Sequence, residues 1–81
     1  MKKSIKIVHR KLGKYQAYGL AWQEDRTIEI DERLRGYEHL ETFIHELLHI
    51  QNPVWPEMKV RGHAKEMAGH LWKHNYRRVE Q

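Results

Sequence analysis

Residues 43–51, FIHELLHIQ, place two histidines four positions apart, with a glutamate directly after the first of them. Apolar side chains recur around them at the three-to-four-residue spacing of an α-helix. A helix is therefore expected from about residue 37 or 38 to residue 50 or 51. Its inner stripe comprises Leu40, Ile44, Leu47 and Gln51, widened by Phe43, Leu48 and Ile50. This helix decides the fold, because the rest of the chain has to bury its apolar stripe.

The downstream segment 52–56, NPVWP, ends this helix. Pro53 cannot continue a helix and biases Asn52 away from helical angles, whereas Pro56 suits the first position of a new helix. A second helix is expected from Pro56 to about Tyr76. Its inner stripe comprises Val60, Ala64, Met67 and Leu71.

Upstream of the first helix, three short segments have the alternation of apolar and polar residues that is typical of β-strands. They span residues 4–9, 15–22 and 27–31. We therefore predict an α+β fold, in which a small antiparallel three-stranded sheet is followed by the FIHELLHIQ helix and a second long helix. The segment 27–31, TIEID, is expected at the edge of this sheet.

The composition limits the class of protein. The 81 residues are expected to form a single domain, residues 1–81. The absence of cysteine excludes disulfides, thiolate ligands and a cysteine nucleophile, and it is typical of a reducing compartment. Neither a signal peptide nor a membrane span is recognisable, so a cytoplasmic protein without a membrane partner is expected. The net charge of +4 permits nucleic-acid contact, but a solvated basic surface is the favoured interpretation.

His45 and His49 stand one helical turn apart, so both imidazoles project from the same face of the helix. Their ring nitrogens can converge on one zinc ion at the usual distance of about 2.0–2.1 Å. Glu46 follows the first histidine and is expected beside the open position of the metal. This arrangement is typical of a site in which the glutamate acts as general base toward a water on zinc.

A catalytic zinc needs a third protein ligand, which has to come from the second helix. The candidates are Glu57, His63, Glu66, His70 and His74. In a helical hairpin the start of the second helix lies beside the end of the first, so Glu57 is expected near His49. Glu57 lies about 50° from the centre of the inner stripe, and His63 about 70°. Glu57 is therefore the first choice, and His63 is the alternative.

Through His45, Glu46 and His49 the chain resembles the zincin metallopeptidases, whose signature these residues match position by position. Its order of elements is similar to that of a minimal gluzincin, in which a glutamate on the following helix completes the zinc site. It is also similar to small HEXXH proteins of phages and prophages and, more distantly, to SprT-like and ImmA/IrrE-type peptidases. The SprT-like pattern has a histidine as third ligand, which keeps His63 open. The resemblance implies a zinc-dependent peptidase that acts on a peptide or protein, with Glu46 as general base.

Two other functions stay open at this point. One is a zinc-stabilised basic module that binds nucleic acid or a protein without turnover, in which Glu46 would have no use as a base. The other is a latent peptidase whose C-terminal segment, residues 74–81, covers the site. Trp55 is interpreted as a hydrophobic plug of the helical hairpin rather than as a wall of the metal pocket. The candidates to hold an oxyanion are Tyr37, Tyr76 and His74.

Overall fold

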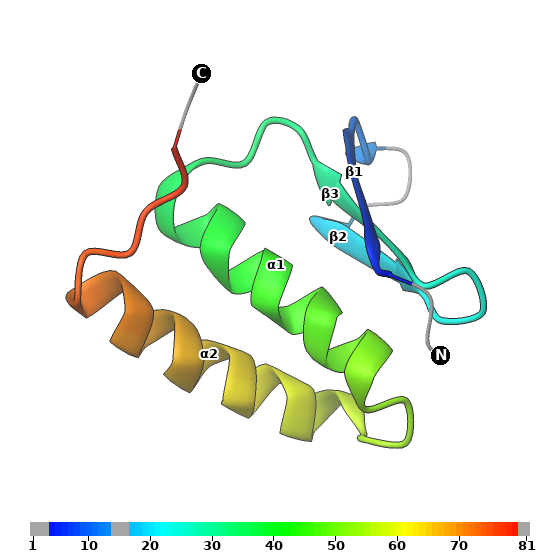
Figure 1. The fold of residues 1–81 in the computed structure, drawn as a ribbon. Helices are drawn as coiled ribbons and strands as arrows, with labels where there is room; N and C mark the ends of the chain where they lie inside the picture. The colour runs from blue at the N-terminus through cyan, green and yellow to red at the C-terminus, as the bar shows by residue number, and fades with distance from the viewer. Residues whose placement is uncertain (1–3, 14–16, 80–81) are drawn as a thin grey trace.

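The computed structural model describes residues 4–13 and 17–79, so residues 15 and 16 of the predicted strand 15–22 lie outside the described part. The elements are β1 (Lys6–Arg10), β2 (Gly19–Trp22), β3 (Thr27–Asp31), α1 (Gly36–Gln51) and α2 (Glu57–Lys73). Helix α1 packs on the sheet, and α2 packs on the side of α1 away from the sheet (Figure 1). No described helix combines the length and the apolar character that crossing a membrane requires.

The sheet differs from the predicted antiparallel arrangement. Its strand order is β1-β3-β2, and β1 runs parallel to β3, so the sheet is mixed. The antiparallel pair is β2 with β3, which a tight turn at residues 23–26 connects. The α+β class is confirmed, but the antiparallel sheet is wrong. The segment 27–31, which was expected at the edge, forms the central strand.

Strand β3 takes the centre because its side chains are buried on both faces. Ile28 and Ile30 are fully buried in the cluster that α1 covers. Glu29 is buried on the opposite face, where Arg10 of β1 and Trp22 of β2 both donate hydrogen bonds to its carboxylate. The hydrogen bond from Arg10 holds the pKa of Glu29 below its ordinary value, although burial opposes this. The alternation of apolar and charged residues in this segment is typical of an edge strand. The hydrogen-bond partners that allow Glu29 to be buried come from the two neighbouring strands.

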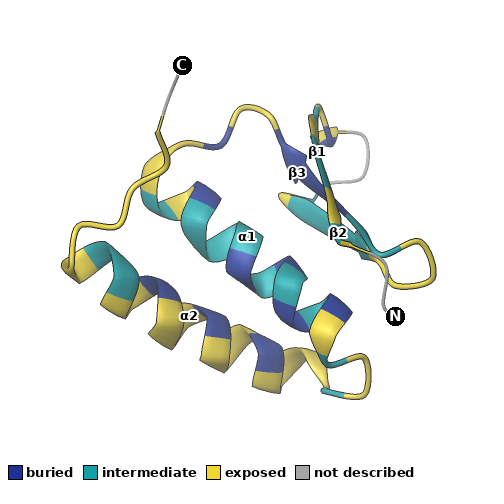
Figure 2. Cartoon of the chain, viewed as in Figure 1, coloured by how far each residue is buried: buried dark blue, intermediate teal, exposed yellow. Residues whose placement is uncertain are grey.

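Two buried clusters lie on opposite sides of α1. The cluster toward the sheet comprises Ile28, Ile30, Leu34 and Ile50. The cluster toward α2 comprises Ile44, Leu48, Val60, Ala64 and Ala68. Figure 2 shows the buried face of α2 turned toward α1 and its exposed face turned to solvent. Helix α1 is thus the middle layer, and its apolar surface is wider than a single stripe.

The predicted stripes need correction at several positions. In α1, Leu40 and Leu47 are half-buried and Gln51 is exposed. In α2, Met67 is 43% exposed and its neighbour Ala68 is fully buried. One residue corresponds to about 100° around a helix, so these neighbours point in different directions. The small Ala68 side chain faces α1 and leaves the longer Met67 at the margin.

The connection between the helices has a defined geometry. The backbone N–H of Asn52 and its side-chain amide both donate to the carbonyl of Leu48, at 2.8 and 3.2 Å, which ends α1. Pro56 is the N-cap of α2, which begins at Glu57, one residue later than predicted. This short connection sets which turn of α2 lies beside the last turn of α1.

The fold predicts a large difference between two valines. Val60→Ala should lower the free energy of unfolding by about 2–3 kcal/mol, because Val60 is fully buried between the helices. Val54→Ala removes the same atoms from a side chain that is 89% exposed, so its effect should stay within about 0.5 kcal/mol. Urea unfolding monitored by circular dichroism measures both. Equal effects would contradict the described packing of α2.

Candidate metal centre

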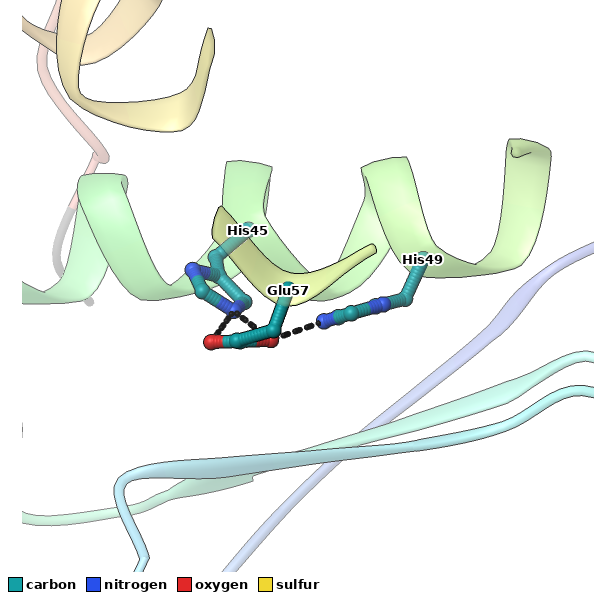
Figure 3. A group of neighbouring side chains, drawn as sticks. All are labelled: His45, His49 and Glu57. Atoms are coloured by element: carbon teal, nitrogen blue, oxygen red, sulfur yellow. Dashed lines mark hydrogen bonds and ion pairs between the residues drawn. The ribbon is translucent and has the colours of Figure 1, made fainter. Parts of the chain in front are cut away.

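Two histidines of α1 and one glutamate of α2 converge at the connected ends of the two helices (Figure 3). His45 and His49 lie one turn apart on α1, and Glu57 is the first residue of α2. Nε2 of His49 lies 2.8 Å from Oε1 of Glu57, and Nε2 of His45 lies 3.1 Å from Oε2. The ligand atoms that the three residues offer all lie within 4.8 Å of one another.

These donors fit a zinc ion in type and in spacing. Imidazole nitrogens and carboxylate oxygens are usual zinc ligands, at about 2.0–2.2 Å from the metal. Two ligands of a tetrahedral ion at such distances lie about 3.3–3.4 Å apart. The closest approaches between the histidine nitrogens and the carboxylate oxygens are 2.8 and 3.1 Å, so a small widening of the group would admit the ion. Three protein ligands leave a fourth position open, as in catalytic rather than structural zinc sites.

The other candidates for the third ligand lie elsewhere. His63 is exposed and packs its ring against Trp55, with 4.8 Å between the ring centroids. The remaining candidates, which are exposed on the later part of α2 or at its C-cap, are Glu66, His70 and His74. Within residues 4–13 and 17–79, the candidate metal group contains Glu57 and not His63. Trp55 packs against the cluster between the helices, which agrees with its interpretation as a plug.

Glu57 is held in its ionised form by its neighbours. Burial raises its pKa, but hydrogen bonds with His49 and His45 and their positive charge outweigh this effect. The net pKa of Glu57 therefore lies below its ordinary value. Arg61, one turn later on α2, places Nη2 at 3.4 Å from Oε2 of the same carboxylate. An ionised carboxylate at neutral pH is the form that binds a metal.

Glu46 lies on the side of α1 that faces β2, and it is only 9% exposed. A Cβ atom placed on Gly19 would lie 3.0 Å from Cγ of Glu46 and 3.1 Å from its Oε2. The backbone of β2 therefore passes directly against this carboxylate. Burial raises the pKa of Glu46 above its ordinary value, although the positive charge of His45 and His49 opposes the rise. This shift moves the pKa of Glu46 toward neutral pH, and a general base is most effective when its pKa lies near the pH of the reaction.

Two adjoining cavities meet at Glu46, with volumes of about 460 and 350 Å³. Gly19, His45 and Glu46 line both of them. The larger cavity extends toward Tyr18 and Arg61, and the smaller one extends toward the other two members of the metal group. The metal group and the buried carboxylate therefore line adjoining cavities beside β2.

The sequence did not predict three residues of this site, which are Tyr18, Gly19 and Arg61. They differ in how far the sequence pattern indicates their place. Gly19 interrupts a predicted strand, and a glycine there often marks a close approach of another part of the chain. Arg61 stands one helical turn after Glu57, so its place follows once Glu57 is chosen. Tyr18 has no local signal, because its position depends on how β2 pairs with β3.

The C-terminal segment lies at the other end of the helix pair (Figure 1). Helix α2 ends at Lys73, before the predicted end, and Asn75 then adopts a left-handed φ of 70°. Nη1 of Arg78 lies 3.3 Å from Nε2 of His39, near the start of α1. Residues 80 and 81 lie outside the described part of the chain. The described residues of the segment 74–81 do not cover the metal group.

The predicted oxyanion residues also lie away from the two cavities. Tyr37 contacts Trp72 edge-on, with 5.8 Å between the ring centroids. Tyr76 lines a groove near the end of α2, and His74 is the C-cap of that helix. In their place, Tyr18 reaches the larger cavity of the site.

Comparisons with known proteins give no family for the chain. No protein-family model matches it, and no curated protein or solved structure gives a match. The interpretation of the metal centre therefore depends on its geometry and on the chemistry of its donors.

One equivalent of zinc is expected to bind through His45, His49 and Glu57. Replacing any of the three by alanine should weaken zinc binding more than about 100-fold, because the loss of an outer-shell partner alone costs 10–100-fold. Competition with a zinc-binding dye measures the affinity. His63→Ala and His70→Ala are matched controls and should bind zinc as the wild type does. Loss of affinity in His63→Ala with retention in Glu57→Ala would reverse the choice of third ligand.

A methyl group at position 19 should displace β2 from α1. The added Cβ would lie 2.8 Å from Cγ2 of Thr42, a β-branched side chain that cannot turn away easily. Gly19→Ala should therefore cost about 1–3 kcal/mol in urea unfolding, as overpacking does. Its zinc affinity should not change, since the new atom meets Thr42 and Glu46 and not the metal group.

Gly62→Ala is the control for this change. It lies in α2 with open space around the new atom and should stabilise the protein by up to about 1 kcal/mol. If Gly19→Ala unfolds at the urea concentration of the wild type, the close contact between β2 and Glu46 is not present in solution.

Proposed function

We propose that this protein is a zinc-dependent peptidase. The observation that carries the proposal is the arrangement of two histidines and one carboxylate as zinc donors, beside a buried glutamate with a raised pKa. A closed structural site has four protein ligands and no use for such a base. The resemblance to the zincin signature supports the same conclusion.

Within this proposal, His45, His49 and Glu57 hold the ion. Bound zinc would polarise the scissile carbonyl and lower the pKa of a water molecule at the open position. Glu46 accepts the proton of that water on a carboxylate oxygen and then donates it to the nitrogen of the departing amine. Burial of Glu46 serves this role, because it weakens the preference of the carboxylate for the charged state.

The substrate in this proposal is an extended peptide that pairs with β2. Strand β2 is an edge of the sheet, and no other described strand pairs with its outer side. Its residues line both cavities beside Glu46. Backbone hydrogen bonds to an edge strand bind a peptide irrespective of its sequence. This assignment replaces β3, which the strand order excludes as an edge.

Tyr18 and Arg61 are proposed to contact the substrate near the scissile bond. Both line the larger cavity, and their hydroxyl and guanidinium groups can donate hydrogen bonds to a carbonyl oxygen. We place the protein in the cytoplasm within this proposal, since a chain without cysteine suits a reducing compartment.

The catalytic prediction concerns Glu46→Gln, which keeps the shape of the side chain and removes its basicity. The variant should retain zinc but cleave peptides about 10²–10⁴-fold more slowly, which is the usual contribution of a general base. A mixed peptide library at high enzyme concentration, read by mass spectrometry, measures the cleavage of zinc-loaded protein.

Glu66→Gln is the matched control, because Glu66 is exposed on α2 and outside the metal group. It should cleave at the wild-type rate. Cleavage that is the same in the wild type, Glu46→Gln and Glu66→Gln would indicate a contaminating enzyme. Zinc binding without any cleavage would favour a zinc-stabilised binding module instead.

A further inference from the structure

A second concave surface lies at the opposite end of the helix pair from the metal group. We call it the arginine groove; its volume is about 660 Å³, and it lies between the start of α1, the end of α2 and the C-terminal segment. Its apolar lining comprises Leu40, Phe43, Leu71 and Trp72. None of the residues of the metal group lines it. A groove of this size, apolar in its lining with a few polar groups, is typical of a site for one small organic molecule.

Three arginines add positive charge to this apolar surface. Arg35 precedes α1, and Arg77 and Arg78 follow α2, so two segments distant in sequence supply them. The guanidinium of Arg77 lies over the ring of Trp72, 3.4 Å from the centroid. This stacking holds the exposed guanidinium beside the apolar lining. The arginine groove therefore combines an apolar wall with a fixed cation.

Within the described residues, the hydrogen bonds of these arginines go to uncharged acceptors. Nη1 of Arg35 donates to the carbonyls of Glu32 and Leu34, at 2.7 and 2.8 Å. Nη1 of Arg77 donates to the carbonyls of Trp72 and Tyr76, at 2.8 and 3.1 Å. Carbonyl oxygens orient a guanidinium but carry no net charge.

The third arginine, Arg78, contacts a ring nitrogen of His39, and an imidazole ring carries no negative charge. The groove is lined by two histidines and three arginines, and no aspartate or glutamate is among its described lining residues. An anionic ligand would supply the compensating charge, and a guanidinium can bind a carboxylate through two parallel hydrogen bonds.

We propose that the arginine groove binds a small amphipathic anion, in which an unbranched apolar chain ends in one carboxylate. The chain would lie along the apolar wall between α1 and α2, and the carboxylate would meet the arginines at the rim. The three arginines of the groove favour an anion, and its apolar lining favours a chain that loses water on binding. This inference is independent of the peptidase proposal, because the two sites share no residue.

The test uses the full chain and decanoate, at concentrations below those that form micelles, in titration calorimetry. Decanoate should bind at one equivalent, and hexanoate should bind more weakly, by up to roughly fourfold for each methylene that the shorter chain lacks. Decyltrimethylammonium has the same chain and the opposite charge and should not bind. Equal binding of both ten-carbon compounds would overturn the proposal, because the arginines would then have no role.

Two double variants with the same net charge separate the arginine groove from charge in general. Arg77→Gln with Arg78→Gln should weaken decanoate binding about tenfold or more, as the loss of charge-assisted hydrogen bonds does. Lys65→Gln with Lys73→Gln removes two exposed charges of α2 outside the groove and should leave binding unchanged. Equal weakening by both pairs would overturn the proposal.

Arg35→Gln provides a variant that leaves the C-terminal segment intact, and it should also weaken binding. Urea unfolding of each variant verifies that the fold is retained, and the His45→Ala variant should bind decanoate as the wild type does. The last measurement tests binding of the protein to vesicles of phosphatidylglycerol. Binding to these vesicles without binding to decanoate would assign the surface to a membrane and overturn the small-molecule proposal.

Discussion

The close packing of α2 on α1 determines where Glu57 lies, and the candidate metal centre depends on it. Val60, Ala64 and Ala68 present a narrow, fully buried stripe to α1. The alanines of this stripe are small, so the helix axes can approach closely. The short connection around Pro56 then fixes the turn of α2 that meets His49. A longer connection or a bulkier stripe would leave two histidines on one helix without a third donor.

Burial of Glu46 lowers the free energy of unfolding at neutral pH. Its pKa in the folded protein is raised above the ordinary 4.5, so the folded state holds its proton more firmly than the unfolded chain does. Well below pH 4.5 this carboxyl is protonated in both states, so its ionisation does not affect stability. As pH rises through 4.5 and above, the unfolded chain ionises first, and the stability of the folded protein falls. A buried acid that destabilises the protein at neutral pH is the pattern expected of a functional residue.

The helices could be predicted from the sequence, but the way in which the strands pair with one another could not. The helix with His45 and His49 and the helix that starts near Glu57 follow from apolar periodicity and from two prolines. The order of the strands does not, because Arg10 and Trp22 donate hydrogen bonds to Glu29 only once β1 and β2 lie on either side of β3. The choice of Glu57 over His63 was possible because a helical hairpin relates residues near its turn in a simple way. No such rule relates the oxyanion candidates to the site.

The position of Glu46 on α1 also explains why β2 has a glycine beside the site. The helix presents Glu46 toward the sheet, and a buried carboxylate there needs space that a side chain on β2 would take. Gly19 provides this space, and Gln23 at the following turn donates a hydrogen bond of 2.9 Å to the carbonyl of His49. The β2 strand and its turn therefore meet α1 both beside Glu46 and beside His49. In the proposed peptidase, a peptide that paired with β2 would be positioned against the carboxylate of Glu46 by the backbone of the strand itself.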